Sequence, residues 1–269
     1  MLQLSDMRDY VRNIVDITSN DITDATMNTF LREGYDVIVF SEKRWPFYET
    51  AVTFDTVASQ KDYSMSDVAT NLSFTHDGVT FSGASAPSNV GLREIASLKT
   101  TNHVLEYIGY DVGDLIYPLD SNTTGKPWYW SMWSSGSSAS AGISNQTIRL
   151  YPTPGSVQTI SVRGYRNAVD FGGNTAVYRT AIADANTADL PVPFNNVLAL
   201  YAIYRSYQQQ EDAAMGQQYY GQFIQELENL RARFEDAPAA QPLILNSIRA
   251  SRWMGQSYLP NRLRYSWEL

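Results

Sequence analysis

Apolar side chains recur every three or four residues in two stretches near the start of the chain, which predicts two amphipathic helices. The first helix is expected over residues 5–17, with Ser5 as its N-cap. The second is expected over residues 23–44, with Thr23 as its N-cap. It ends before Pro46, because the residue that precedes a proline avoids helical geometry.

The pattern changes between residues 48 and 167, where short runs rich in β-branched and aromatic residues predict strands. These runs are Thr50-AVTFDTV, Leu92-REIASL, Trp128-YWSMW, Thr147-IRLYP and Thr159-ISVRGY. Clusters of Gly, Ser, Asn and Pro between the runs predict loops. Residues 110–118 are expected to form one or two helical turns. The middle of the chain is therefore predicted to be a β sandwich or a small barrel.

Helical spacing returns in residues 193–210 and 212–234. The apolar residues of the last helix share one face. They are Met215, Tyr219, Phe223, Leu227, Leu230 and Phe234. Pro238 ends this pattern.

Each pair of amphipathic helices needs a partner for its apolar face, and packing the two pairs together would satisfy both. We therefore predict an α+β fold. Residues 1–47 and 190–238 would form a four-helix bundle, residues 48–189 an inserted β-rich domain, and residues 239–269 an extended C-terminal arm.

Charge is unevenly distributed along the chain. The net charge of the 269 residues is −8, but residues 1–240 carry −11 and residues 241–269 carry +3. The acidic body argues against a protein that coats DNA, since binding to phosphates depends on Lys and Arg. The basic arm is complementary to its own body, and so to a neighbouring copy or a similarly acidic partner.

The sequence also limits the cellular setting of the chain. It has no cysteine, which excludes disulfides and thiolate zinc sites. No apolar run approaches the ~20 residues needed to span a bilayer. The start, MLQLSDMRDY, has acids where a signal peptide needs a cationic flank. We expect a protein that acts without a membrane and without export by the general secretory route.

Catalytic signatures are missing from the sequence. No P-loop or nucleophile elbow occurs, and His76 and His103 have no second ligand at metal spacing. Two groups of carboxylates could be acid–base pairs or calcium ligands: Asp111 with Asp114, and Asp16, Asp21 and Asp24. Neither has the spacing of a calcium loop, so helix caps and solvated loops are the favoured interpretation. We predict no enzyme activity, no cofactor and no metal, with a hydrolase of dispersed carboxylates as a rival hypothesis.

The segment 128–133 is the densest aromatic feature in the middle of the chain, with Trp128, Trp130 and Trp133. Aromatic rings stack on sugars, so a virion carbohydrate-binding or tail-tip module is the alternative function. The favoured interpretation is a strand along which Trp128, Trp130 and Ser131 alternate, and whose inner side fills the sandwich core.

Aromatic residues and arginines are interspersed in the last 24 residues. Disordered segments are usually poor in aromatics, whereas Tyr, Trp and Arg are enriched where interfaces concentrate their binding energy. A disordered tail and a segment packed on its own subunit remain open, but the composition favours an intermolecular arm. Its predicted partner-binding residues are Arg249, Arg252, Trp253, Tyr258, Leu259, Arg262, Arg264, Tyr265 and Trp267.

Two segments resemble the head-to-tail adaptor proteins of tailed phages, including tail tubular protein A-like adaptors. Thr23-DATMNTFLREGYDVIVFSEKRWPFYE is similar to their second helix and its exit. Leu198-ALYAIYRSYQQQEDAAMGQQYYGQFIQELENLRARF is similar to their closing helix pair. The order of helix pair, β insert, helix pair and C-terminal arm is similar too.

The resemblance implies a structural protein without an enzymatic task. It implies a homo-oligomeric ring, usually dodecameric, that joins the portal to a downstream neck or tail protein at the virion neck. It also implies assembly in the host cytoplasm and passage of DNA through the ring without sequence-specific binding. On this basis the arm would bind the portal, with its arginines on acidic groups and its aromatic residues in pockets.

Overall fold

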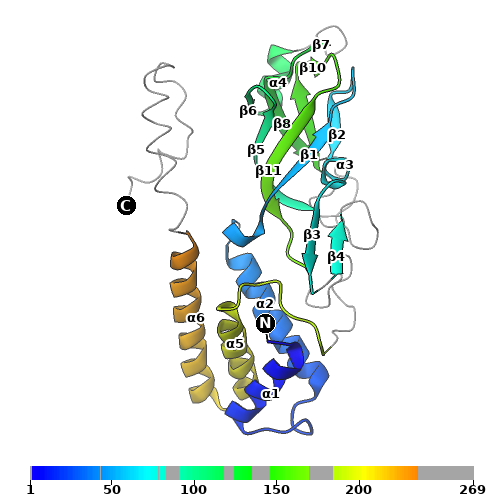
Figure 1. Cartoon of the computed structure of the whole chain (residues 1–269). Coiled ribbons are helices and arrows are strands. Elements are labelled where there is room, and N and C mark those ends of the chain that lie inside the picture. The colour runs from blue at the N-terminus through cyan, green and yellow to red at the C-terminus, as the bar shows by residue number, and fades with distance from the viewer. Residues whose placement is uncertain are drawn as a thin grey trace.

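Helices occupy one end of the molecule and a curled β-sheet occupies the other (Figure 1). The computed structural model describes residues 2–42, 44–77, 79–82, 91–117, 124–134, 146–169 and 184–235. These residues contain six α-helices and a seven-stranded sheet, which confirms the predicted α+β class. The predicted arm at residues 239–269 lies outside the described residues.

The long helices are close to their predicted positions. They are α1 (Leu4–Val15), α2 (Asp24–Ser41), α5 (Phe194–Gln209) and α6 (Ala213–Glu235). Thr23 caps α2 as predicted, because its Oγ1 accepts a hydrogen bond from the backbone N of Thr26 at 3.3 Å. The predicted N-cap of α1 is wrong. Gln3 is the N-cap and forms a capping box with Asp6, so Ser5 lies in the first turn.

All four long helices contribute to one hydrophobic core, and α5 lies between α2 and α6 (Figure 1). Helices α2 and α5 approach closely at Gly34, where a Cβ would lie only 2.9 Å from the ring of Tyr201. Helix α6 packs chiefly on α5, through the buried Phe223, Leu227 and Leu230. The apolar face predicted for this helix is thus confirmed, whereas a four-helix bundle stays a prediction.

The β-rich region is built from short elements. Its strands are β1 (Glu49–Asp55), β2 (Asp62–Ser64), β3 (Ser73–His76), β4 (Val79–Ser82), β5 (Leu92–Thr100), β6 (Val104–Tyr107), β7 (Thr124–Gly125), β8 (Tyr129–Ser134), β9 (Gln146–Tyr151), β10 (Thr153–Pro154) and β11 (Thr159–Arg166). The short helices are η1 (Pro46–Tyr48), α3 (Met65–Ala69) and α4 (Tyr110–Ile116). The five predicted strand runs correspond to β1, β5, β8, β9 and β11, and α4 confirms the predicted helical turns.

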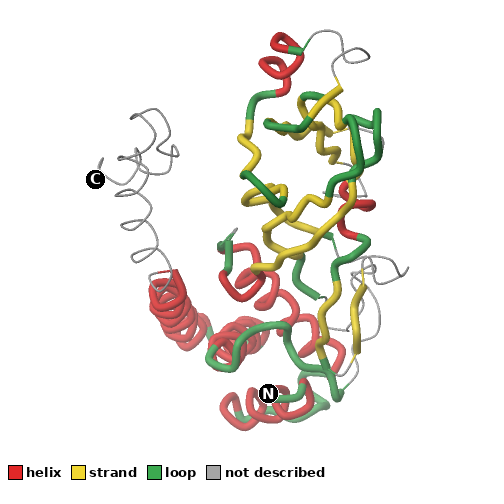
Figure 2. Tube along the Cα trace, turned by 45° about the horizontal axis from the view of Figure 1, so that its top comes forward, coloured by secondary structure: helices red, strands yellow, loops and turns green. Residues whose placement is uncertain are grey.

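The large sheet has the strand order β1-β11-β5-β6-β8-β9-β2. Its neighbours are antiparallel except β6 and β8, which are parallel. The sheet curls so that side chains of its two edge strands are in contact, since Phe54 of β1 and Tyr63 of β2 have ring centroids 5.2 Å apart. A β sandwich and a small barrel were the two predicted forms. The described strands make a single sheet that curls toward a barrel (Figure 2). Strand pairs β3–β4 and β7–β10 are separate.

The helical region and the curled sheet have separate hydrophobic cores, and polar groups join them. Arg166, at the end of β11, pairs with both carboxylate oxygens of Asp189 at 2.6 and 2.9 Å. The hydroxyls of Tyr48 and Tyr35 donate to the backbone oxygens of Asp189 and Val169 at 2.7 and 2.6 Å. Burial raises the pKa of both tyrosines, so they remain protonated donors. The residue boundaries proposed for the domains stay a prediction.

Candidate protein-binding surfaces

The nine residues predicted to bind a partner, from Arg249 to Trp267, lie outside the described residues. The structure does show where the chain leaves α6. Phe234 packs against Phe47 and Phe194, with ring centroids 5.7 and 5.4 Å away. Arg231 pairs with Glu42 at 2.7 Å. The predicted arm therefore follows a helix end that is fixed beside the junction of the two regions.

The three tryptophans of the aromatic segment lie in different environments. Trp130 is buried in the core of the sheet, which confirms the core interpretation for this residue. Trp128 precedes β8 and is 52% exposed beside His103, so the core interpretation is wrong for it. Trp133 is half-buried and packs on the guanidinium of Arg149. The structure therefore gives the three rings no shared face on which a sugar could stack.

Sequence reasoning missed the most strongly paired side chain of the sheet region, Arg149 on β9. Only 7% of this residue is exposed. Its Nε and Nη2 donate to the two carboxylate oxygens of Asp62 at 2.7 and 3.1 Å. Its Nη1 donates to Asp114 at 3.1 Å and to the hydroxyl of Tyr110 at 3.0 Å. The hydrogen bonds to Asp62 raise the pKa of the guanidinium, which stays charged.

The carboxylate of Asp114 fixes α4 on the sheet. It accepts hydrogen bonds from Arg149 and, at 2.9 Å, from the hydroxyl of Tyr151. Burial opposes ionisation of Asp114, but hydrogen bonds from Tyr151 and Tyr110 and the charge of Arg149 outweigh it and lower the pKa. Burial also raises the pKa of Tyr151 to about 12, so this hydroxyl remains a donor.

Helix α4 rests on the sheet through polar groups and exposes apolar ones. A Cβ on Gly113 would lie 2.4 Å from Cζ of Tyr151, so only glycine permits this close seat. The opposite face carries Val112, Leu115 and Ile116, of which Leu115 is 79% exposed. We call these three side chains the α4 surface. Their spacing of three and four residues is visible in the sequence, but only the structure shows that this face points outward.

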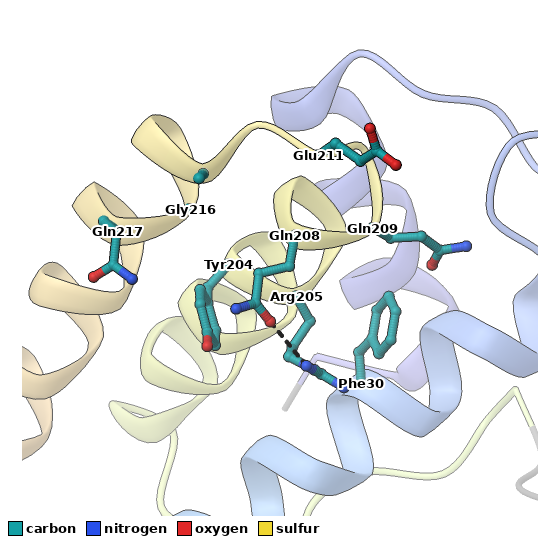
Figure 3. Close-up of a pocket in the computed structure, with 9 residues that line it drawn as sticks. Phe30, Tyr204, Arg205, Gln208, Gln209, Glu211, Gly216 and Gln217 are labelled. Carbon is teal, nitrogen blue, oxygen red and sulfur yellow. Dashed lines mark hydrogen bonds between the residues drawn. The ribbon is translucent and has the colours of Figure 1, made fainter.

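A groove with a volume of about 540 Å³ lies at the turn between α5 and α6 (Figure 3). Arg205 crosses it, donating from Nη1 to Gln208 at 2.8 Å and pairing with Glu33 at 2.9 Å. The guanidinium also lies over the ring of Phe30. Most of the other lining groups are neutral amides or small residues, among them Gln209, Gly216 and Gln217. The groove offers polar contacts but no nucleophile with an adjacent base.

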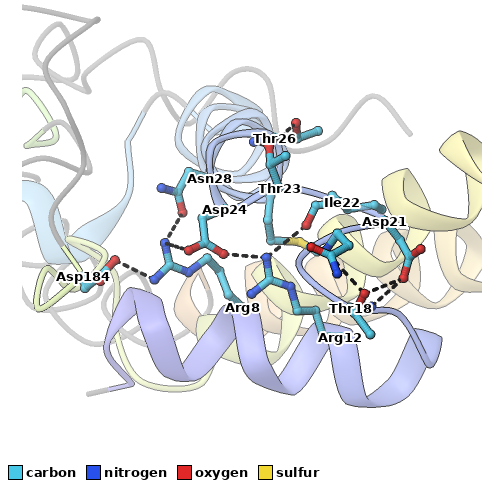
Figure 4. A network of polar contacts seen from close by, with 12 residues as sticks. Arg8, Arg12, Thr18, Asp21, Ile22, Thr23, Asp24, Thr26, Asn28 and Asp184 are labelled. Carbon is cyan, nitrogen blue, oxygen red and sulfur yellow. Dashed lines mark hydrogen bonds and ion pairs between the residues drawn. The ribbon is translucent and has the colours of Figure 1, made fainter.

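The acids near the start of α2 hold the N-terminal helices together (Figure 4). Asp24 pairs with Arg12 at 2.5 Å and lies 3.9 Å from Arg8. Arg8 also pairs with Asp184 at 2.5 Å and donates to Asn28 at 3.3 Å. The hydrogen bond from Arg12 lowers the pKa of Asp24 although burial opposes it. This network ties α1 to α2 and to the segment before α5.

Asp21 and the two histidines also have structural partners, whereas Asp16 and Asp111 are exposed. Asp21 accepts hydrogen bonds from the backbone N and the hydroxyl of Thr18, both at 2.8 Å. His76 lies 3.1 Å from the backbone oxygen of Thr187, and His103 lies 2.7 Å from that of Pro127. Within the described ranges, no group of three or more His, Cys, Asp or Glu could hold a metal ion. No helix among them is long and apolar enough to cross a membrane.

Comparison with known proteins finds a family that the chain matches. A family model described as SU10 adaptor protein matches residues 2–244. The match covers both regions of the molecule and the first residues after α6. No curated protein matches the chain.

Proposed function

Because the chain belongs to the SU10 adaptor protein family, and is thus a structural adaptor of a phage, we propose that it is a ring subunit of the virion neck. The ring would be a dodecamer that joins the portal to the tail. Rings require heterologous contacts between neighbours, in which two different surfaces of the same chain meet. The family match over residues 2–244 is the observation that carries this proposal.

The C-terminal arm would bind the portal. Its charge supports this role, because residues 241–269 carry +3 whereas the rest of the chain carries −11. An arm of opposite charge suits a separate acidic surface as well as a neighbouring copy. The arginines would pair with acidic groups of the portal, and the aromatic residues would fill pockets. The fixed end of α6, where Phe234 packs on Phe47, gives the arm a rigid base.

The acidic body would also line the path of DNA. A wall with net negative charge repels phosphates, so DNA would pass through the ring without sticking. This arrangement needs no base-specific contact and no catalytic group. Ordering of the arm on the portal would have an entropic cost that only the portal contact offsets. Adaptors would then add to a finished portal instead of forming rings on their own.

The direct test is binding to the purified portal ring of the same phage. Full-length protein should bind, and a chain that ends at Leu245 should not. Replacing Arg252, Arg262 and Arg264 with Gln should weaken binding mainly at low salt, because salt screens exposed charges. Replacing Trp253 and Trp267 with Ala should weaken it at all salt concentrations.

A control variant replaces one exposed arginine of the body. Arg163→Gln, on β11, removes one positive charge that is 66% exposed and leaves the arm intact. It should bind the portal as the wild-type protein does. Equal binding by the full-length and truncated chains would show that the arm is not the anchor. Closed rings formed by the isolated protein would contradict the dependence of ring formation on the portal.

A further inference from the structure

We propose that the α4 surface is the docking site for the next neck or tail protein, and that this partner presents apolar side chains within a rim of Lys and Arg. This inference rests on the proposed function and deepens it by assigning one face of the adaptor to its downstream contact. Helix α4 lies at the end of the β region that is farthest from α1 (Figures 1 and 2).

Exposed apolar side chains are concentrated at this end of the molecule. Among the described residues, fifteen large apolar side chains are exposed, and six of them belong to β6 and α4. Those six are Val104, Tyr107, Tyr110, Val112, Leu115 and Ile116. Scattered exposed apolar residues are ordinary, but a cluster on one short segment marks an interaction site.

Contacts with the sheet fix the orientation of α4, so the exposure of its apolar face is a property of the folded chain. Asp114 is bonded to Arg149 and Tyr151, and Gly113 lies directly against the ring of Tyr151. A helix on the surface of a soluble domain normally turns its apolar face inward and its polar face outward. Helix α4 does the reverse, because it turns the carboxylate of Asp114 toward the sheet, where Arg149 and Tyr151 bind it.

Charge around the α4 surface indicates the chemistry of the partner. Residues 104–117 contain Glu106, Asp111 and Asp114, and no Lys or Arg. Asp114 is neutralised by Arg149, whereas Glu106 and Asp111 are exposed. A partner with basic residues at its rim would therefore be attracted and oriented by this surface. The apolar centre within a charged rim is the usual arrangement of a protein interface.

A symmetric contact between two α4 surfaces is disfavoured by the same charges. In a twofold arrangement the same surface of both copies meets, so the acids of one copy would face the acids of the other. The portal is proposed to hold the C-terminal arm, which follows α6 beside Phe47, at the junction of the two regions. The downstream component is thus the partner that remains for the far end of the β region.

The experiment is reconstitution with DNA-filled heads and tails from an infection that lacks the adaptor. Full-length wild-type protein, the double variant Leu115→Gln/Ile116→Gln and the single variant Asp111→Lys are added in turn. Adaptor bound per head is measured by mass spectrometry, and tailed particles are counted by electron microscopy. Val157→Gln, at a side chain that is 67% exposed before β11, is the matched control.

The double variant should add to heads as the wild-type protein does, while tailed particles fall roughly tenfold or more, since apolar anchors carry most interface energy. Asp111→Lys should lower tailed particles on the order of threefold, because it repels a basic rim. The control should match the wild type in both measurements. A cooperative thermal unfolding transition at the wild-type temperature would show that each variant is folded.

Four other outcomes would overturn the assignment. Normal tail attachment by the double variant would mean that the α4 surface does not bind the tail. If the double variant does not add to heads, the α4 surface binds the portal instead. If it adds to heads but forms no ring there, the α4 surface binds a neighbouring copy. If wild-type protein itself does not add to heads, the proposed function is wrong and this inference falls with it.

Discussion

Helices α6 and α4 turn opposite faces toward their own chain. The 23 residues of α6 bury Phe223, Leu227 and Leu230 against α5 and expose amides and charges. The seven residues of α4 place the charged Asp114 on the sheet and expose Val112, Leu115 and Ile116. The first arrangement stabilises the fold, because it removes apolar area from water. The second leaves that area available to a partner.

The two ends of the molecule therefore use their helices for different purposes. In the helical region the apolar residues form a core that all four long helices share. In the sheet region the core lies inside the curl, and the outer face near α4 is held by ions and hydroxyls around Arg149. Substitutions should separate these purposes, since core changes alter stability and α4 changes alter binding.

The largest effect is expected for Phe223→Ala on α6. Its side chain is fully buried and its ring lies 5.2 Å from that of Tyr201, so the change leaves a cavity in the shared core. We expect the free energy of unfolding to fall by about 3–5 kcal/mol, as measured by urea denaturation. Gln225→Ala, on the exposed face of the same helix, is the control and should stay within about 0.5 kcal/mol of wild type. A small loss for Phe223→Ala would mean that α6 contributes little to the core.

The next largest effect is expected for Arg149→Met under α4. The change leaves Asp62 and Asp114 without their shared cation, and both carboxylates are only partly exposed. Removing one partner of such a group should cost about 2 kcal/mol of unfolding free energy, less than for fully buried charges. Arg163→Met is the control, because this arginine is mostly exposed and its pair with Glu49 should contribute under about 1 kcal/mol. Equal losses for the two variants would contradict the role of Arg149 as the anchor.

The comparison of α6 with α4 also shows how far sequence reasoning reaches. The spacing of residues 215–234 was enough to predict α6 and its buried face, because six apolar positions recur along one side of the helix. The two turns of α4 were predictable, but their orientation was not. That orientation depends on Arg149, which is 35 residues away from Asp114 and reaches it only through the pairing of β8 and β9. Long-range partners of this kind leave no local pattern in the chain.

A smaller effect should appear in the dependence of stability on pH. The pKa of Asp114 is lowered in the folded chain, so between its folded and unfolded values the unfolded chain binds more protons. This contribution is present above the unfolded pKa near 3.9 and is lost as pH falls toward the folded pKa. It should be below about 1 kcal/mol, since the side chain is 38% exposed and solvent screens the pair. Asp114→Asn should give a flatter curve of unfolding free energy between about pH 5 and pH 2. A curve as steep as that of the wild type would show that the carboxylate is not held as an ion.

The smallest effect on stability is expected at the α4 surface itself, and this is the sharpest contrast with α6. Leu115→Gln changes a side chain that is 79% exposed, so folding buries little of it and little is lost when it becomes polar. The free energy of unfolding should stay within about 0.5 kcal/mol of wild type in the same urea measurement used for Phe223→Ala. The same substitution at Leu227 on α6 should lower the free energy of unfolding more, because only 7% of that residue is exposed. A loss of more than about 1 kcal/mol for Leu115→Gln would mean that the chain covers its own α4 surface in solution, and that the face is part of the fold rather than a site for another protein.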